Sequence, residues 1–184
     1  LAVREYAPKV LENGKNILIL SVGALSDSYF RKTLIEKARK SGRKIHIPSG
    51  AIMGLDNLKV GQISRINSVL LKTTKSPKSL GMQVATRTLV FNGKANECIK
   101  QFPKNINVSV ALALAVDHDV DVELWADPEV DRNIHDIHVL GEFGEVSIRV
   151  VNQPSPDNPA TSYLAALSVL SLLKNLDNPL VIGS

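Results

Sequence analysis

Two asparagines and one histidine are the side chains in this sequence that could act together on a ligand. Asn105 and Asn107 stand directly before the apolar run Val108–Val116, and His135 follows on a strand-like alternation. Polar groups at a helix start can bind an anionic or polar ligand, and histidine has the unperturbed pKa that suits proton transfer near neutrality. The three residues predict a site for a small polar ligand, with His135 moving protons.

Each of these residues also has a simpler structural interpretation. An asparagine ahead of a helix is often only a cap, and a single histidine on a strand is more often a hydrogen-bonded structural residue than a catalyst. His135 shares its side of the strand with Ile137 and Val139, whereas Asp136 and His138 point the other way. Periodicity therefore leaves two readings of His135 open, a buried structural residue or the floor of a pocket.

Composition limits the class of protein. The chain has 184 residues, of which 44% are hydrophobic and 22% charged, enough for one sizeable domain or two small ones. The net charge is +4, but the basic residues are scattered, and the densest cluster (Lys72, Lys75 and Lys78) is typical of a solvated loop. No aromatic residues interleave that cluster, so we expect no nucleic-acid partner.

The reactive side chains argue against a disulfide framework or a metal centre. Cys98 is the one cysteine, which excludes an internal disulfide and fits a reducing compartment. The acidic group Asp117–Asp121 lacks calcium-loop spacing and is typical of a solvated turn. The apolar run before it is too short to span a bilayer, and no basic segment followed by an apolar one marks a signal peptide in these residues. We expect a cytoplasmic protein without metal or membrane attachment.

The first part of the chain predicts a βαβ unit. Its connecting loop, 23–27, would lie at the carboxyl edge of a parallel sheet, where such sheets bind ligands, and Ser26 or Asp27 would cap the helix that follows. The expected elements are a helix over 1–12, a strand over 16–22 buried on both faces, a helix ending at about Lys40 before Gly42, and a strand over 44–47.

The second part predicts a mixture of helices and strands. Three stretches that alternate apolar and polar residues, 120–126, 133–140 and 145–152, favour an antiparallel meander. A last helix over 163–173 is apolar on most sides, which predicts that it is well buried. The other expected elements are a helix over 55–63, a strand over 66–74 and a helix over 94–101, with 82–91 left unassigned.

Familiar nucleotide-binding and hydrolase motifs are missing from the sequence, which contains no P-loop, no G-x-G-x-x-G turn and no G-x-S-x-G elbow. Other motifs are present, and they carry a resemblance that runs over essentially all of the chain. They are FPKNINV, ADP followed by N-x-H-x-I, G-x-FGE, N-x-P-x-NPATSYLAALS, SVGALSD and IPSGAIMGLD. On these motifs the sequence resembles the L-aspartate dehydrogenase family.

The resemblance implies an NAD- or NADP-dependent oxidoreductase that converts L-aspartate to iminoaspartate, which hydrolyses to oxaloacetate and ammonia. In some organisms the iminoaspartate feeds NAD biosynthesis. The resemblance also implies a homodimer. Carried over by motif, His135 matches the catalytic histidine and Ala24 matches a cofactor-binding position. The family's cofactor-binding asparagine is either Asn105 or Asn107, and the motif does not distinguish them.

The resemblance also sets the expected fold class, α/β, with a partial Rossmann domain and an α+β catalytic domain whose sheet is mostly antiparallel. Residues 1–48 would be the carboxyl-terminal part of the NAD(P)-binding domain, and 49–159 the catalytic and dimerisation domain. The last helix, 160–176, would pack back on the Rossmann part. The chain opens at Leu1 inside a helix-like stretch, so we expect the glycine-rich phosphate-binding turn to lie before it.

Without that turn, we expect these 184 residues alone to bind NAD poorly and not to turn over. Two alternatives to an L-aspartate dehydrogenase remain open. One is a catalytically incompetent dimerisation or ligand-binding module of the same fold. The other is a related dehydrogenase acting on another amino acid.

Overall fold

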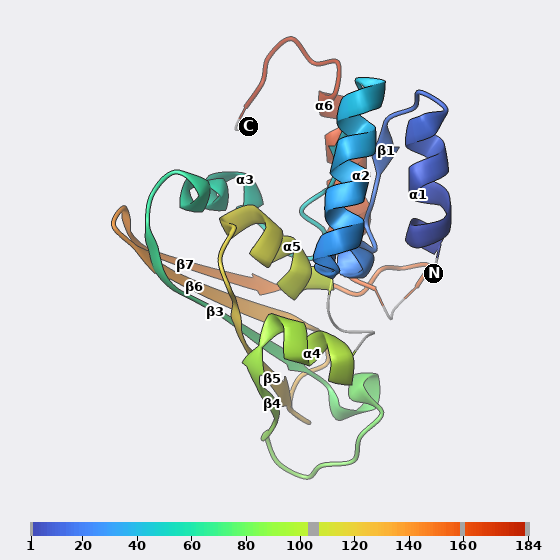
Figure 1. Cartoon of the computed structure of the whole chain (residues 1–184). Coiled ribbons are helices and arrows are strands. Elements are labelled where there is room, and N and C mark those ends of the chain that lie inside the picture. The colour runs from blue at the N-terminus through green and yellow to red at the C-terminus, as the bar shows by residue number, and fades with distance from the viewer. Residues whose placement is uncertain (1, 103–106, 159–160, 183–184) are drawn as a thin grey trace. The chain divides into compact units, whose positions relative to one another are not determined.

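The protein is described by a computed structural model, which covers residues 2–102, 107–158 and 161–182 (Figure 1). The chain divides into two compact units, Leu1–Pro48 and Ser49–Ser184. The predicted βαβ unit lies in the first unit and the predicted α+β arrangement in the second. Each unit is taken separately below.

Unit 1 has the predicted βαβ connectivity. Its strands β1 (Ile17–Leu18) and β2 (Ile45–His46) are parallel, and Ile17 pairs with Ile45. The prediction of a long strand over 16–22 buried on both faces is wrong, because β1 has two half-buried residues and the chain turns into a 3-10 helix at Val22. Within the described residues β1 pairs with β2 alone, so its other edge has no strand to cover it. The helices are α1 (Ala2–Glu12) and α2 (Ser28–Ser41).

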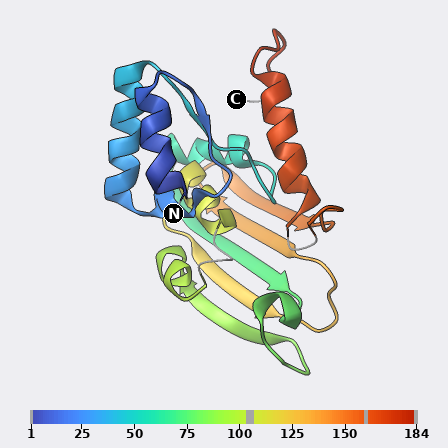
Figure 2. The ribbon, with the colours of Figure 1, turned by 90° about the vertical axis from the view of Figure 1, so that its right-hand side faces the viewer.

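Unit 2 contains a five-stranded sheet with the order β4-β5-β3-β6-β7 (Figure 2). The central strand β3 is parallel to β5 and antiparallel to β6, so the sheet is mostly antiparallel as predicted. The strands are β3 (Ile66–Lys75), β4 (Thr88–Lys94), β5 (Asp121–Ala126), β6 (Ile134–Gly141) and β7 (Gly144–Val151). The helices are α3 (Leu55–Leu58), α4 (Ala95–Gln101), α5 (Asn107–Val116) and α6 (Tyr163–Asn175).

The predicted three-stranded meander is wrong in one connection. The β6–β7 hairpin forms as expected, but β5 and β6 are not neighbours, because β3 lies between them and pairs with both. Alternation in the sequence identifies strands and their faces. It does not show whether a strand from earlier in the chain will insert between two consecutive strands. The connection between β5 and β6 therefore passes β3 rather than forming a tight hairpin.

One face of this sheet carries the core of unit 2. The apolar side chains of α5, with Leu112 fully buried, pack against the inner-facing positions of β3, β5 and β6. Six of these positions, none more than 3% exposed, are Val69, Leu71, Val122, Leu124, Ile137 and Val139. The sheet therefore has a covered inner face and an outer face with polar cross-strand pairs.

Gly61 makes a close approach that a side chain would disturb. A Cβ at this position, in the 3-10 turn Lys59–Gln62, would lie 2.7 Å from the carbonyl oxygen of Val116 at the end of α5 and would collide with Ile66. We expect Gly61→Ala to lower the free energy of unfolding by ~1–3 kcal/mol, the usual cost of overpacking. Urea denaturation measures the loss, and Ile63→Ala, at a neighbouring position that is 90% exposed, should be nearly neutral.

Helix α6 forms where predicted but is not buried. None of its residues is buried, and Leu170 and Leu173 are 62% and 52% exposed. The prediction of a well-buried helix is therefore wrong for the described chain, although the apolar pattern that prompted it is present. The backbone N–H of Gly50 donates to the Ser168 hydroxyl at 3.1 Å, which ties α6 to the Gly50 loop of unit 2. Among the described helices, none is long and apolar enough to cross a membrane.

Candidate active site

His135 lies on the covered face of the sheet in unit 2. It is 3% exposed, beside Ile137 and Val139 on β6, while His138 is exposed on the opposite face. The prediction that His135 points inward with the apolar residues is therefore confirmed. Because buried polar groups are nearly always hydrogen-bonded, we expect the buried imidazole to have a hydrogen-bond partner.

The partner of His135 is a threonine on the neighbouring strand. Thr73 pairs directly with His135 across the β3–β6 ladder, and its hydroxyl lies 3.0 Å from Nδ1 of the ring. The threonine is itself only 4% exposed. This hydrogen bond fixes the orientation of the imidazole and leaves Nε2 as the ring nitrogen that can act on a ligand.

Lys75 is a third polar residue on this inner face, after His135 and Thr73. It follows Thr73 by two positions, so the strand places both on the side that carries Val69 and Leu71. The prediction of a solvated loop is wrong for this lysine, because it ends β3 and burial lowers the pKa of its ammonium. Lys72, from the same predicted loop, lies on β3 and pairs with Glu123 at 3.3 Å.

The surroundings keep the His135 ring neutral. Burial, and in second place the positive charge of Lys75, lower the pKa of His135 from its ordinary 6.5 to about 3. At neutral pH the imidazole is therefore uncharged and has a lone pair available to accept a proton. A neutral histidine fixed through Nδ1 is the form that a general base requires.

This lowered pKa predicts a pH dependence of stability. The unfolded chain binds a proton on His135 below about pH 6.5, whereas the folded chain does not do so until about pH 3. The contribution of His135 to the free energy of unfolding is therefore fully present above pH 6.5. It is lost as the pH falls toward 3, and the loss is at most roughly 5 kcal/mol. We expect His135→Gln to flatten the fall of unfolding free energy with pH in this window, as followed by urea denaturation.

The exposed His138 supplies the control for this measurement. It lies on the same strand but faces the other side, where its Nδ1 is 3.0 Å from the Ser147 hydroxyl. His138→Gln should leave the slope of the protein's stability against pH close to that of the parent. Equal slopes for the parent and His135→Gln would contradict the description of His135 as a buried neutral base.

The structure describes one of the two asparagines of the predicted site. Asn107 is the first residue of α5, the helix that packs on the inner face of the sheet. Asn105 lies outside the described residues. The structure therefore places Asn107 at a helix start, where an amide can serve a ligand, and the choice between the two asparagines stays open.

Ala24 lies in the predicted turn of unit 1. The 3-10 helix Val22–Ser26, which follows β1 and precedes α2 in the chain, contains Ala24 at a half-buried position. The Ser26 hydroxyl donates to the Gly23 carbonyl at 2.8 Å, and the Arg31 guanidinium donates to the Leu25 carbonyl at 2.6 Å. The small residues Gly23 and Ala24 let a flat ligand approach the backbone closely at this edge of the sheet.

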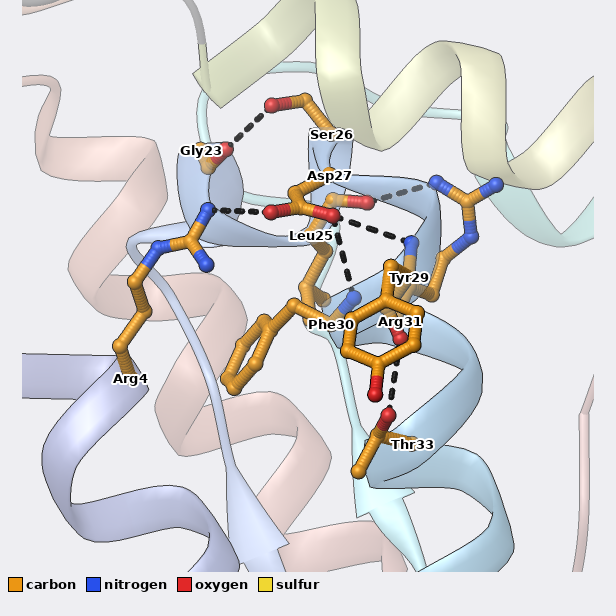
Figure 3. Close-up of polar contacts among 9 residues, drawn as sticks. All are labelled: Arg4, Gly23, Leu25, Ser26, Asp27, Tyr29, Phe30, Arg31 and Thr33. Carbon is orange, nitrogen blue, oxygen red and sulfur yellow. Dashed lines mark hydrogen bonds and ion pairs between the residues drawn. The ribbon is translucent and has the colours of Figure 1, made fainter.

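Asp27 closes the turn by capping α2. Its carboxylate accepts from the N–H groups of Tyr29 at 3.0 Å and Phe30 at 3.1 Å and pairs with Arg4 at 3.0 Å (Figure 3). The pKa of Asp27 lies below its ordinary value, chiefly because of the Phe30 N–H and then because of Arg4. Of the two candidate caps, Asp27 is the one that acts.

The cap decides what this helix start can bind. A free helix N-terminus attracts a phosphate, but the N–H groups of α2 already hold the Asp27 carboxylate, whose negative charge would repel one. The Ala24 turn therefore suits an uncharged part of a dinucleotide, such as a ribose or a nicotinamide. In the described part of unit 1, α2 does not offer a site for the pyrophosphate.

The acidic group at 117–121 does not gather around a ligand. Asp119 and Asp121 both pair with Lys94, at 3.5 Å and 2.7 Å, and Asp117 adopts a left-handed turn with φ of 49°. Within the part of the chain that the structure describes, no cluster of three or more histidine, cysteine or acidic residues could hold a metal ion. These residues form the turn between α5 and β5.

Comparisons with known proteins identify the family. The family described as aspartate dehydrogenase, C-terminal, matches residues 56–176. An L-aspartate dehydrogenase from Methanospirillum hungatei is 86% identical over all 184 residues, which cover 73% of that relative. The chain belongs to the L-aspartate dehydrogenase family.

Further comparisons extend the family assignment to both units. The family described as homoserine dehydrogenase, NAD binding domain, matches residues 1–48. An L-aspartate dehydrogenase from Methanothermobacter thermautotrophicus is 48% identical over 183 residues, which cover 71% of that protein. A crystal structure of aspartate dehydrogenase from Thermotoga maritima superposes with a TM-score of 0.87 at 35% identity, over 99% of this chain and 74% of that one.

These findings confirm the predicted fold class, a partial NAD-binding domain with a parallel sheet followed by an α+β region with a mostly antiparallel sheet. They also support the cofactor prediction, NAD or NADP, because an NAD-binding family matches unit 1. Sequence reasoning did not single out Thr73 and Lys75. The signal was available, since both continue the alternation of Val69 and Leu71 on the inner face of β3.

Proposed function

We propose that this chain carries the catalytic residues of an NAD(P)-dependent L-aspartate dehydrogenase. The observation that carries the proposal is the buried, neutral His135, fixed through Nδ1 by Thr73, in a chain of this family. The substrate follows from the relatives, which are named L-aspartate dehydrogenases. The product would be iminoaspartate, which water converts to oxaloacetate and ammonia.

His135 would act as the general base. Its Nε2 takes the proton that the substrate ammonium must lose before the C–N bond can become an imine, or deprotonates the water that attacks that imine. NAD or NADP, when bound, would supply the acceptor for the hydride that leaves the substrate Cα. In the tautomer that this role requires, Nδ1–H donates to the Thr73 hydroxyl oxygen and Nε2 carries the lone pair that faces the substrate.

Each of the two units has a candidate residue for contact with the cofactor. Ala24, at the carboxyl edge of the unit 1 sheet, would contact the cofactor through its backbone and methyl group. Asn107 at the start of α5, or Asn105 before it, would hydrogen-bond a carboxamide such as that of nicotinamide. A homodimer and a supply of iminoaspartate to NAD biosynthesis belong to the same proposal and rest on the resemblance, whereas a cytoplasmic location rests on the single cysteine, Cys98.

The test uses a completed protein. We define this as the 184 residues joined to the segment of the Methanospirillum hungatei relative that the alignment leaves over, since the chain covers 73% of that relative. L-aspartate should cause reduction of NAD⁺ or NADP⁺, followed by the absorbance of the reduced cofactor, and D-aspartate should not. Reduction with another L-amino acid but not with L-aspartate would favour the related-dehydrogenase alternative.

The alternative of a non-catalytic module makes the opposite prediction. A completed protein that is folded and binds the cofactor, but does not reduce it with any amino acid, would favour that reading. Sedimentation analysis of the same sample separates the proposed homodimer from a monomer.

A further inference from the structure

The inner face of β3 changes from apolar to polar at its carboxyl end. Val69 and Leu71 are buried in the core, and the next two positions on the same face are Thr73 and Lys75. Thr73 holds His135, so the polar end of the strand lies at the candidate base. A lysine at such a position is costly to bury and is rarely placed there for packing alone.

The neighbouring strands fix where Lys75 stands. Its backbone pairs with Ala126 on β5, and its carbonyl accepts from the N–H of Asp127 at 2.9 Å. Lys75 is therefore anchored on one side by β5, while His135 faces Thr73 on the other side from β6. The end of the strand is a rigid part of the sheet, as a binding group requires.

Charge links the two side chains. The Lys75 ammonium lies near enough to His135 to lower the pKa of the imidazole, and burial lowers the pKa of Lys75 itself. A positive charge in poorly solvated surroundings gains most from an anionic ligand that reaches it. L-aspartate carries two carboxylates close to the amine on which His135 would act.

We propose that Lys75 binds a carboxylate of the amino-acid substrate and so holds its amine beside His135. This inference rests on the proposed function, because it takes the dicarboxylate substrate from it. Lys75 is then a binding residue of the substrate and not of the cofactor. Its role differs from that of Lys72, three positions earlier, which pairs with Glu123 on the outer face of the sheet.

The first experiment measures the kinetics of Lys75→Met in the completed protein. We expect the KM for L-aspartate to rise by about 10²-fold, the usual effect of losing a charge-assisted contact in a buried site, while the dissociation constant of the cofactor stays within about twofold. Lys75→Arg, which keeps the charge, should recover most of the loss. Lys72→Met is the matched control and should leave both constants near the parent values.

An unchanged KM for L-aspartate, or an equal weakening of cofactor binding, would overturn the proposal. If Lys75→Met does not fold, as judged by circular dichroism, Lys75→Gln keeps a polar head of similar length. The same rise in KM for Lys75→Gln but not for Lys75→Arg then supports the charge as the cause. Equal effects of the two variants would overturn it.

A binding measurement separates this inference from the proposed function. Succinate has both carboxylates but no amine, so it can bind without reacting, and calorimetry with the cofactor present reports its affinity. Loss of succinate binding in Lys75→Met supports the inference even if the parent protein does not oxidise L-aspartate, which would refute only the proposed function. Oxidation of L-aspartate by the parent, with succinate binding insensitive to Lys75→Met, would overturn the inference and leave the function standing.

Discussion

Replacing His135 with alanine should lower the kcat for L-aspartate oxidation by ~10²–10⁴-fold in the completed protein, the range expected for removing a general base. The ring has one nitrogen fixed by Thr73 and is held neutral by its surroundings. Alanine removes the proton acceptor but leaves the sheet and α5 in place. The KM for the cofactor should change little, because the proposed role is in proton transfer.

His138→Ala is the control for this experiment. It removes an imidazole from the same strand, but from an exposed position on the opposite face. Its kcat should stay within about twofold of the parent, as is usual for a surface substitution. Turnover by His135→Ala that equals that of His138→Ala would rule out His135 as the base.

The lowered pKa of His135 raises a question about its strength as a base. An imidazole with a pKa of about 3 accepts a proton weakly. Part of this lowering comes from the Lys75 charge, and a substrate carboxylate bound at Lys75 would offset that part. Binding of the substrate would thereby remove the smaller of the two causes of the lowered pKa of His135, while the larger cause, burial, would remain.

The sequence allowed the strands and their faces in unit 2 to be predicted wherever one side is apolar. His135 was placed on the inner face by Ile137 and Val139 alone, and the structure agrees. Strand neighbours were harder to predict, because pairing depends on where β3 enters the sheet and not on the pattern within β5 or β6. Lys75 was misplaced for a related reason, since a charged residue two positions before Pro77 suggests a loop, whereas β3 continues as far as Lys75.

Burial of α6 could not be predicted from its own residues. Its apolar pattern shows that some surface can cover it, but not that the covering surface is among these 184 residues. The prediction that it packs on the Rossmann part stays a prediction. The roles of the site residues Ala24, Asn105 and Asn107 also stay predictions, because they came from the resemblance.

The 184 residues alone should bind NAD⁺ at least about 10²-fold more weakly than the completed protein and should not reduce it with L-aspartate. The physical reason lies at α2, where the Asp27 carboxylate occupies the N–H groups of Tyr29 and Phe30. The pyrophosphate carries negative charge and needs a free helix start or a glycine-rich turn, and α2 offers neither. Calorimetric titration of the two proteins with NAD⁺, together with the absorbance assay, measures both parts of the expectation.

Asp27→Asn tests whether the cap is the obstacle to phosphate binding. An asparagine can still cap the helix through its side-chain oxygen, but it carries no negative charge and gives up the ion pair with Arg4. Because the asparagine still occupies the N–H groups of Tyr29 and Phe30, this variant should leave NAD⁺ binding weak in the 184 residues, and a gain of NAD⁺ binding would identify the Asp27 charge as the obstacle. Strong binding by the unmodified 184 residues, or turnover without the added segment, would show that they hold a phosphate site that α2 does not provide.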